Sequence, residues 1–238
     1  MAIGIQQKID NLKIAYTDYE TSYKDISRSG DLDQIACGRG CSHCCKQLIF
    51  VYEIDGLYLR LYIDKLRFSS DLQKQQQGEK FKNNIEKWIE EFKIFIKQEK
   101  INIDLMISKC EVAEGKRWEW VTKIWDTYKR HLKRSNMDCP FLANNECSIY
   151  EHRPLVCRSY WSLDVEICKS FFEIKNFKAQ IKSPIVQDRI REQFEKEIYE
   201  LSLSKRKIPL PLVVANPECY LTYEGIGALD GIEWKELS

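Results

Sequence analysis

The sequence has little of what a membrane protein or an exported protein shows. Its longest unbroken apolar runs are Leu48–Tyr52 and Leu212–Ala215, far short of the roughly 18 apolar residues that a membrane-spanning helix needs. The first ten residues contain no basic start followed by an apolar core, so we expect no secretory signal. These two absences predict a cytoplasmic protein without membrane association, in a compartment where thiols are kept reduced.

The chain also lacks an excess of charge of either sign. Lys and Arg total 37 and Asp and Glu total 36, so we expect no nucleic-acid partner. There is no phosphate-binding glycine loop, no nucleophile elbow and no His-Glu-x-x-His helix. The commoner catalytic classes are therefore unsupported, and the sequence leaves open whether the protein is an enzyme.

What the sequence does have is cysteine, ten in 238 residues. Eight of them fall into two sets separated by a long gap: Cys37, Cys41, Cys44 and Cys45, then Cys139, Cys147, Cys157 and Cys168. Clustered thiols in a reducing compartment indicate metal ligands or redox groups before disulfides, although disulfides stay open if the protein is exported. Gly38 and Gly40 let the first loop fold back closely around a metal centre. We expect the two sets to meet in space and to hold metal.

The spacing of the first set bears on which metal it holds. A two-residue gap such as Cys41-x2-Cys44 lets two thiolates reach one ion. The adjacent Cys44 and Cys45 tend to point to different sides of the chain, which suits a larger cluster or two separate sites better than one tetrahedral zinc. Eight thiols would fill two four-thiolate sites, or one site with spare cysteines. The Cys37-x3-Cys41-x2-Cys44 spacing also matches the loop that holds a [4Fe-4S] cluster with one open iron in radical S-adenosylmethionine enzymes. Those enzymes are usually built on repeated strand–helix units, whereas this sequence shows little strand.

Basic residues beside the cysteines could compensate the negative charge of a thiolate site. The candidates for cofactor binding are Lys46, Arg153 and Arg158, with Arg39 nearby; the plainer alternative for each is surface solubility. We expect His43 to face solvent and His131 and His152 to be ordinary. Cys110 and Cys219 stand alone in the sequence and are expected to be buried structural thiols.

The predicted fold class is mainly α: an irregular helical domain around a loop-rich cysteine core, with very little β. We expect one domain over residues 1–238. Its cysteine core would come from 31–66 and 136–172, and its helical scaffold from 1–30, 70–135 and 183–207.

Apolar residues at alternating spacings of three and four predict the helices. The first is a stripe from Ile5 to Ile26, for which core packing is favoured over a coiled-coil partner surface. The others run through Ile54–Leu66, Phe81–Ile96 and Trp118–Leu132, and from a Ser183-Pro184 start to Leu201.

The segments between these helices carry weaker signals. Gln47–Tyr52 favours a strand, and the polar, glycine-containing segment 73–80 indicates a linker. Ser148–Glu151 has the spacing of a capping box. Residues 208–217 contain several prolines, which predict an extended tail along the surface of the core.

Three short motifs resemble a known family: Cys41-Ser-His-Cys44-Cys45, Cys139-Pro-Phe-Leu, and Cys147-Ser-Ile-Tyr-Glu-His-Arg-Pro-Leu-Val-Cys157-Arg158-Ser-Tyr. They are similar to the CxxCxxCC cysteine-cluster proteins, which are described as zinc- or iron-chelating. The resemblance covers roughly residues 35–66 and 136–172; Cys37 precedes the family's pattern, and Cys168 matches by approximate position.

Some members of this family are labelled iron–sulfur oxidoreductases, and the flagellin lysine N-methylase contains a similar region. The resemblance therefore implies redox or S-adenosylmethionine-dependent chemistry, with a possible protein substrate or partner. On the all-thiol ligand set we favour an iron–sulfur cluster, [4Fe-4S], with all eight cysteines as candidate ligands. The alternative is a structural zinc protein that acts as an interaction or metal-handling module.

Overall fold

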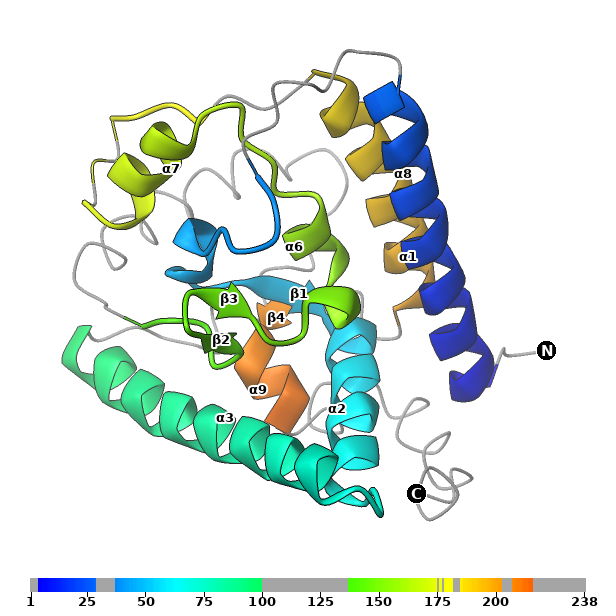
Figure 1. The fold of residues 1–238 in the computed structure, drawn as a ribbon, viewed down its shortest axis with the longest axis vertical. Helices are drawn as coiled ribbons and strands as arrows, with labels where there is room; N and C mark the ends of the chain where they lie inside the picture. Colours follow the sequence, from blue (N-terminus) through cyan, green and yellow to red (C-terminus); the bar gives the residue numbers. More distant parts are fainter. Residues whose placement is uncertain are drawn as a thin grey trace.

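The computed structural model describes residues 4–28, 37–99, 137–174, 176, 178–181, 185–202 and 207–215, and the structural statements below concern these residues. The fold is 66% helical and 6% strand, so the predicted mainly α class is confirmed. The cysteine-bearing loops lie together, between α7 (Val165–Phe172) and the helices α2 (Glu53–Arg67) and α3 (Leu72–Glu99) (Figure 1). None of the described helices is long and apolar enough to cross a membrane.

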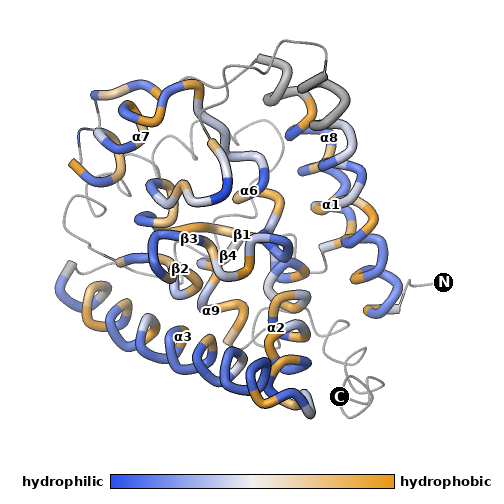
Figure 2. Tube along the Cα trace, viewed as in Figure 1, coloured by the Kyte–Doolittle hydropathy of each residue, from blue (hydrophilic) through white to orange (hydrophobic). Residues whose placement is uncertain are grey.

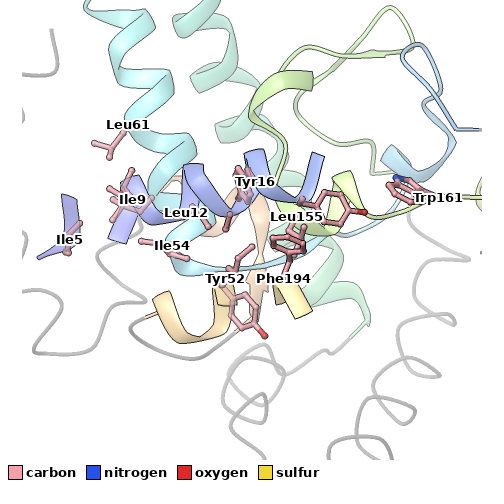
Figure 3. Packing of buried hydrophobic residues seen from close by; sticks show 14 residues of the cluster. Ile5, Ile9, Leu12, Tyr16, Tyr52, Ile54, Leu61, Leu155, Trp161 and Phe194 are labelled. Carbon is pink, nitrogen blue, oxygen red and sulfur yellow. The ribbon is translucent and has the colours of Figure 1, made fainter. Parts of the chain in front are cut away.

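Helix α1 (Ile5–Arg28) packs beside α8 (Ile185–Leu201) and against the start of α2 (Glu53–Arg67) (Figure 1). The predicted stripe of α1 is buried from Ile5 to Tyr19. It shares one apolar cluster with Ile54 of α2 and Phe194 of α8 (Figure 3). The core-packing interpretation is therefore confirmed for the stripe from Ile5 to Tyr19, because its partners lie within the same chain.

Helix α3 (Leu72–Glu99) corrects the predicted linker, since it runs unbroken through the polar segment 73–80. Its first turn is held by the Asp71 carboxylate, which accepts hydrogen bonds from the backbone N–H groups of Gln73 and Lys74. Gly78 lies inside this helix, close to the end of α2. A side chain would not fit there, because a Cβ would come within 2.6 Å of the backbone nitrogen of Arg67. The glycine permits close helix packing and does not break the helix.

The buried side of α3 follows the predicted apolar pattern. Phe81, Ile85, Trp88 and Phe92 are buried, and apolar residues of α3 recur along the helix between polar ones (Figure 2). Helix α3 packs mainly against α2 and α9 (Leu210–Ala215). This pairing forms the layer on which the second cysteine segment rests.

The predicted extended tail is a second correction. Within residues 207–215, the part of the tail that the structure describes, only β4 (Lys207–Pro209) is extended; it pairs antiparallel with β1 (Phe50–Tyr52), which lies within the predicted strand Gln47–Tyr52. The chain then forms the short helix α9 (Leu210–Ala215), with Leu210, Val213 and Val214 buried. Pro211 lies in the first turn of α9, where proline is tolerated. The buried side chains of α9 pack between apolar residues of α2 and α3.

Several predicted features lie outside the described residues. These are the fourth helix, Trp118–Leu132, together with His131, Cys110 and Cys219, and the Ser183-Pro184 start of the last helix. Helix α8 itself begins at Ile185 and ends at Leu201.

Candidate metal centre

The first cysteine segment forms a tight loop followed by the 3₁₀ turn η1 (His43–Cys45). The Cys41 N–H donates to the Gly38 carbonyl at 3.1 Å, and Gly40 adopts a φ of 93°. This left-handed conformation is one that glycine tolerates without steric cost. The expected folding back of this loop is confirmed, and it places Cys41, Cys44 and Cys45 on one compact turn.

The second segment begins with a two-stranded hairpin, β2 (Leu142–Ala143) and β3 (Glu146–Cys147). Its two-residue turn has positive φ at Asn144 (52°) and Asn145 (61°), the conformation that matches the twist of a hairpin. Leu142 pairs with Cys147, and its N–H donates to the Cys139 carbonyl at 2.9 Å. The hairpin thereby brings Cys139 and Cys147 to the same place.

The predicted capping box at Ser148–Glu151 does not form. The residue before the 3₁₀ turn η3 (Tyr150–His152) is Ile149, and no side chain caps this turn. The Ser148 N–H instead donates to the Phe141 carbonyl at 2.8 Å, which continues the hairpin. The chain then turns at Pro154 into α6 (Leu155–Arg158), which carries Cys157, and later into α7 (Val165–Phe172), which carries Cys168.

The two cysteine segments lie side by side. The Cys139 N–H donates to the Cys45 carbonyl at 2.8 Å, and the Ser162 N–H donates to the Cys37 sulfur at 3.0 Å. All eight cysteines of the two sets are free thiols, and Cys168 is the most buried of them. The structure therefore pairs none of these eight in a disulfide.

Burial and mutual repulsion shape the titration of these thiols. Burial, with the nearby sulfurs of Cys45 and Cys147, raises the pKa of Cys157, and burial likewise raises the pKa of Cys139. A hydrogen bond from the Cys37 thiol lowers the pKa of Cys41 to about 6, and one from Cys44 lowers the pKa of Cys45. Because thiols must lose their protons to bind a metal, metal binding to this group releases protons and its affinity rises with pH.

Backbone N–H groups point at several of the sulfurs. Those of Phe141, Ile149 and His43 donate to Cys139, Cys147 and Cys41 respectively. With the Ser162 donor, four of the eight sulfurs accept a backbone hydrogen bond. Such donors stabilise thiolate ligands and tune the centre that they hold.

The three basic residues named as cofactor-binding have different surroundings. Arg153 lies 3.5 Å over the Tyr150 ring, and its charge helps to lower the pKa of Cys45. Lys46 donates to the Glu173 carboxylate at 2.7 Å. Arg158 is buried, where it pairs with Glu20 of α1 and donates to backbone carbonyls of the second segment. Arg39 lies 5.5 Å from the same Tyr150 ring.

The prediction that His43 faces solvent is wrong. Its Nδ1 lies 2.9 Å from the Glu173 carboxylate at the end of α7, and its side chain is only 19% exposed. His152 is half-buried, bonded to the Tyr58 hydroxyl at 2.7 Å and stacked on Tyr62. Sequence reasoning missed Ser162, which donates to the Cys37 sulfur, and Glu173, which binds His43 and Lys46, because no spacing relates either residue to its partners.

The donor set can be tested for its fit to a metal. In the part of the chain that the structure describes, no three His, Cys, Asp or Glu side chains stand at the geometry of a bound ion. The chemistry nevertheless fits, because clustered thiols with N–H donors and a nearby guanidinium are what zinc–thiolate and iron–sulfur centres require. To bind a metal, the thiols that hydrogen-bond to one another in this structure would have to rotate toward it.

Comparison with known proteins agrees with this chemistry. No curated protein and no solved structure matches the chain. The CxxCxxCC family, described as "Putative zinc- or iron-chelating domain", matches residues 36–179, more than half of the chain and the whole of both cysteine sets. The chain therefore belongs to the CxxCxxCC family, and its clustered cysteines form a metal-binding centre.

Proposed function

We propose that this protein holds an iron–sulfur cluster, [4Fe-4S] favoured, and uses it in redox or S-adenosylmethionine-dependent chemistry. The observation that carries the proposal is the meeting of two thiol segments about a hundred residues apart, joined by the Cys139 to Cys45 backbone bond. The proposed ligands are all eight cysteines of the two sets. Thiolate sulfur is the usual protein ligand of iron–sulfur clusters, and an all-thiol donor set favours them.

The surrounding charges support a net negative centre. Arg153 lies close enough for its charge to help lower the pKa of Cys45 and to oppose the rise that burial causes in the pKa of Cys147, so it is the strongest candidate for stabilising a bound cluster. Lys46 and Arg158 are proposed to contribute through Glu173 and through the loop carbonyls that they bind. A buried thiolate centre without such compensation would be costly.

A structural zinc protein is the second candidate. It is favoured by the hairpin that carries Cys139 and Cys147, since zinc binds four thiolates in small loop-rich folds. In this role the protein would act as an interaction or metal-handling module. Either role is proposed for one cytoplasmic domain with a protein substrate or partner.

Anaerobic purification followed by metal and acid-labile sulfide analysis separates these two candidates. We expect iron and sulfide in equal amounts, with visible absorption that bleaches on addition of a reductant. Zinc without acid-labile sulfide would overturn the iron–sulfur proposal and leave the structural role. A change in the spectrum on adding S-adenosylmethionine would distinguish cofactor-dependent chemistry from simple redox use.

A further inference from the structure

The turn η1 presents two consecutive thiols to two different neighbourhoods. Cys44 packs against the apolar cluster that Cys168, Phe171 and Phe172 form on α7, whereas the Cys45 carbonyl accepts a hydrogen bond from the backbone N–H of Cys139. The two thiols touch each other through a hydrogen bond, so their neighbourhoods share a border.

The hairpin side gathers four thiols. Cys139 and Cys147 both pack on the apolar cluster that contains Phe141 and Ile149. Cys157, on α6, lies close enough to Cys45 and Cys147 for both to raise its pKa. The backbone bond from Cys139 brings in Cys45 as the fourth member.

The α7 side gathers the other four. Ser162 links two of them, because its N–H donates to the Cys37 sulfur at 3.0 Å and its hydroxyl bonds to Cys168. The Cys37 thiol donates a hydrogen bond to the Cys41 sulfur, and Cys44 packs against the α7 cluster that contains Cys168. Cys37, Cys41 and Cys168 are therefore linked directly or through Ser162, and Cys44 joins them through the apolar cluster of α7.

We propose that the chain holds two adjacent four-thiolate centres, a hairpin centre formed by Cys45, Cys139, Cys147 and Cys157, and an α7 centre formed by Cys37, Cys41, Cys44 and Cys168. This inference rests on the proposed function, that these thiols bind metal. Four protein thiolates saturate one zinc ion or one [4Fe-4S] cluster. Neither centre then leaves a metal open to S-adenosylmethionine, and the pair fits electron storage or a structural role.

The test compares metal and sulfide per chain, after anaerobic reconstitution, in the wild type, Cys147→Ser, Cys168→Ser, the double variant, and Cys110→Ser as a matched control. We expect the wild type and the control to hold two centres, each single variant to hold one, and the double variant to hold none. Circular dichroism checks that each variant is folded. For iron-loaded protein, the reduced wild type should show magnetic interaction between its two centres in electron paramagnetic resonance, and the single variants should not.

Two outcomes overturn the partition. Complete loss of metal from either folded single variant means that one shared site uses both groups, and full retention means that the replaced cysteine is no ligand. If a variant does not fold, the wild type decides alone, since one centre per chain contradicts the proposal. A wild type that binds no metal refutes the proposed function itself, which keeps the two failures distinguishable.

Discussion

Replacing Gly78 by Ala tests how the scaffold under the cysteine core is packed. A Cβ at this position would lie 2.6 Å from the backbone nitrogen of Arg67 and 3.0 Å from its Cα. Backbone atoms cannot rotate away as a flexible side chain does. The end of α2 and the first turns of α3 must therefore move apart to admit the methyl group.

Two opposing effects set the size of the change. Alanine is preferred over glycine inside a helix by about 1 kcal/mol, which alone would stabilise the variant. Overpacking a close contact costs about 1–3 kcal/mol, and a backbone contact belongs at the upper end of that range. We expect a net destabilisation of about 1–2 kcal/mol, which for a chain of this length lowers the melting temperature by about 2–8 °C.

Urea unfolding followed by far-UV circular dichroism, on proteins with equal metal content, measures this difference. Gln77→Ala is the matched control, because Gln77 is exposed on the same helix and should leave stability unchanged or slightly raised. Should Gly78→Ala be as stable as this control, the close approach of α2 and α3 would be wrong. The segment would then behave as the solvated linker that its composition suggests.

Three further predictions concern the thiols and their supports. Cys157→Ser and Cys44→Ser should each lose one of the two centres together with part of the soluble yield, while Cys110→Ser keeps both; normal metal content in both Cys157→Ser and Cys44→Ser would show that the two segments share no site. Tyr16→Phe removes a hydrogen bond to a buried carboxylate of α2 and should cost about 1–3 kcal/mol in urea unfolding; an unchanged midpoint would contradict that bond. Removing metal with a chelator should speed tryptic cleavage at Arg39 while most of the helical signal remains, because the cysteine loops gain stability from the metal; an equal cleavage rate in both states would show that the loop is held without it.

The predictable part of the fold was encoded in local periodicity. The stripe of α1 and the buried face of α3 follow from residues three and four apart on one helix, whatever the partner surface is. The failures came where the partner decides. Gly78 and Pro211 are residue types that disfavour a helix, yet they lie inside α3 and α9, which pack against neighbouring helices. Pro209 lies in β4, which pairs with β1.

The same division explains what could be predicted of the site. Thiol spacing pointed to the cysteines as candidate metal ligands. Their grouping depends on contacts between residues far apart in sequence, such as Cys45 with Cys139 and His43 with Glu173. No motif encodes those distances, because they are set by the path of the helices between the segments.

The turn η1 lies between the two groups of thiols, and this position affects how α7 is held. Cys44 belongs to the small apolar cluster of α7, and Cys139 and Cys147 belong to the larger cluster under α2, α3 and α9. The turn that carries Cys44 and Cys45 therefore connects the apolar cluster of α7 with the larger cluster of α2, α3 and α9. Metal bound on both sides of this turn would hold α7 against the helical scaffold, whereas metal bound on one side alone would leave α7 supported by its own few apolar contacts. The stability of α7 toward hydrogen exchange should thus depend on its neighbouring thiols more than on those of the hairpin.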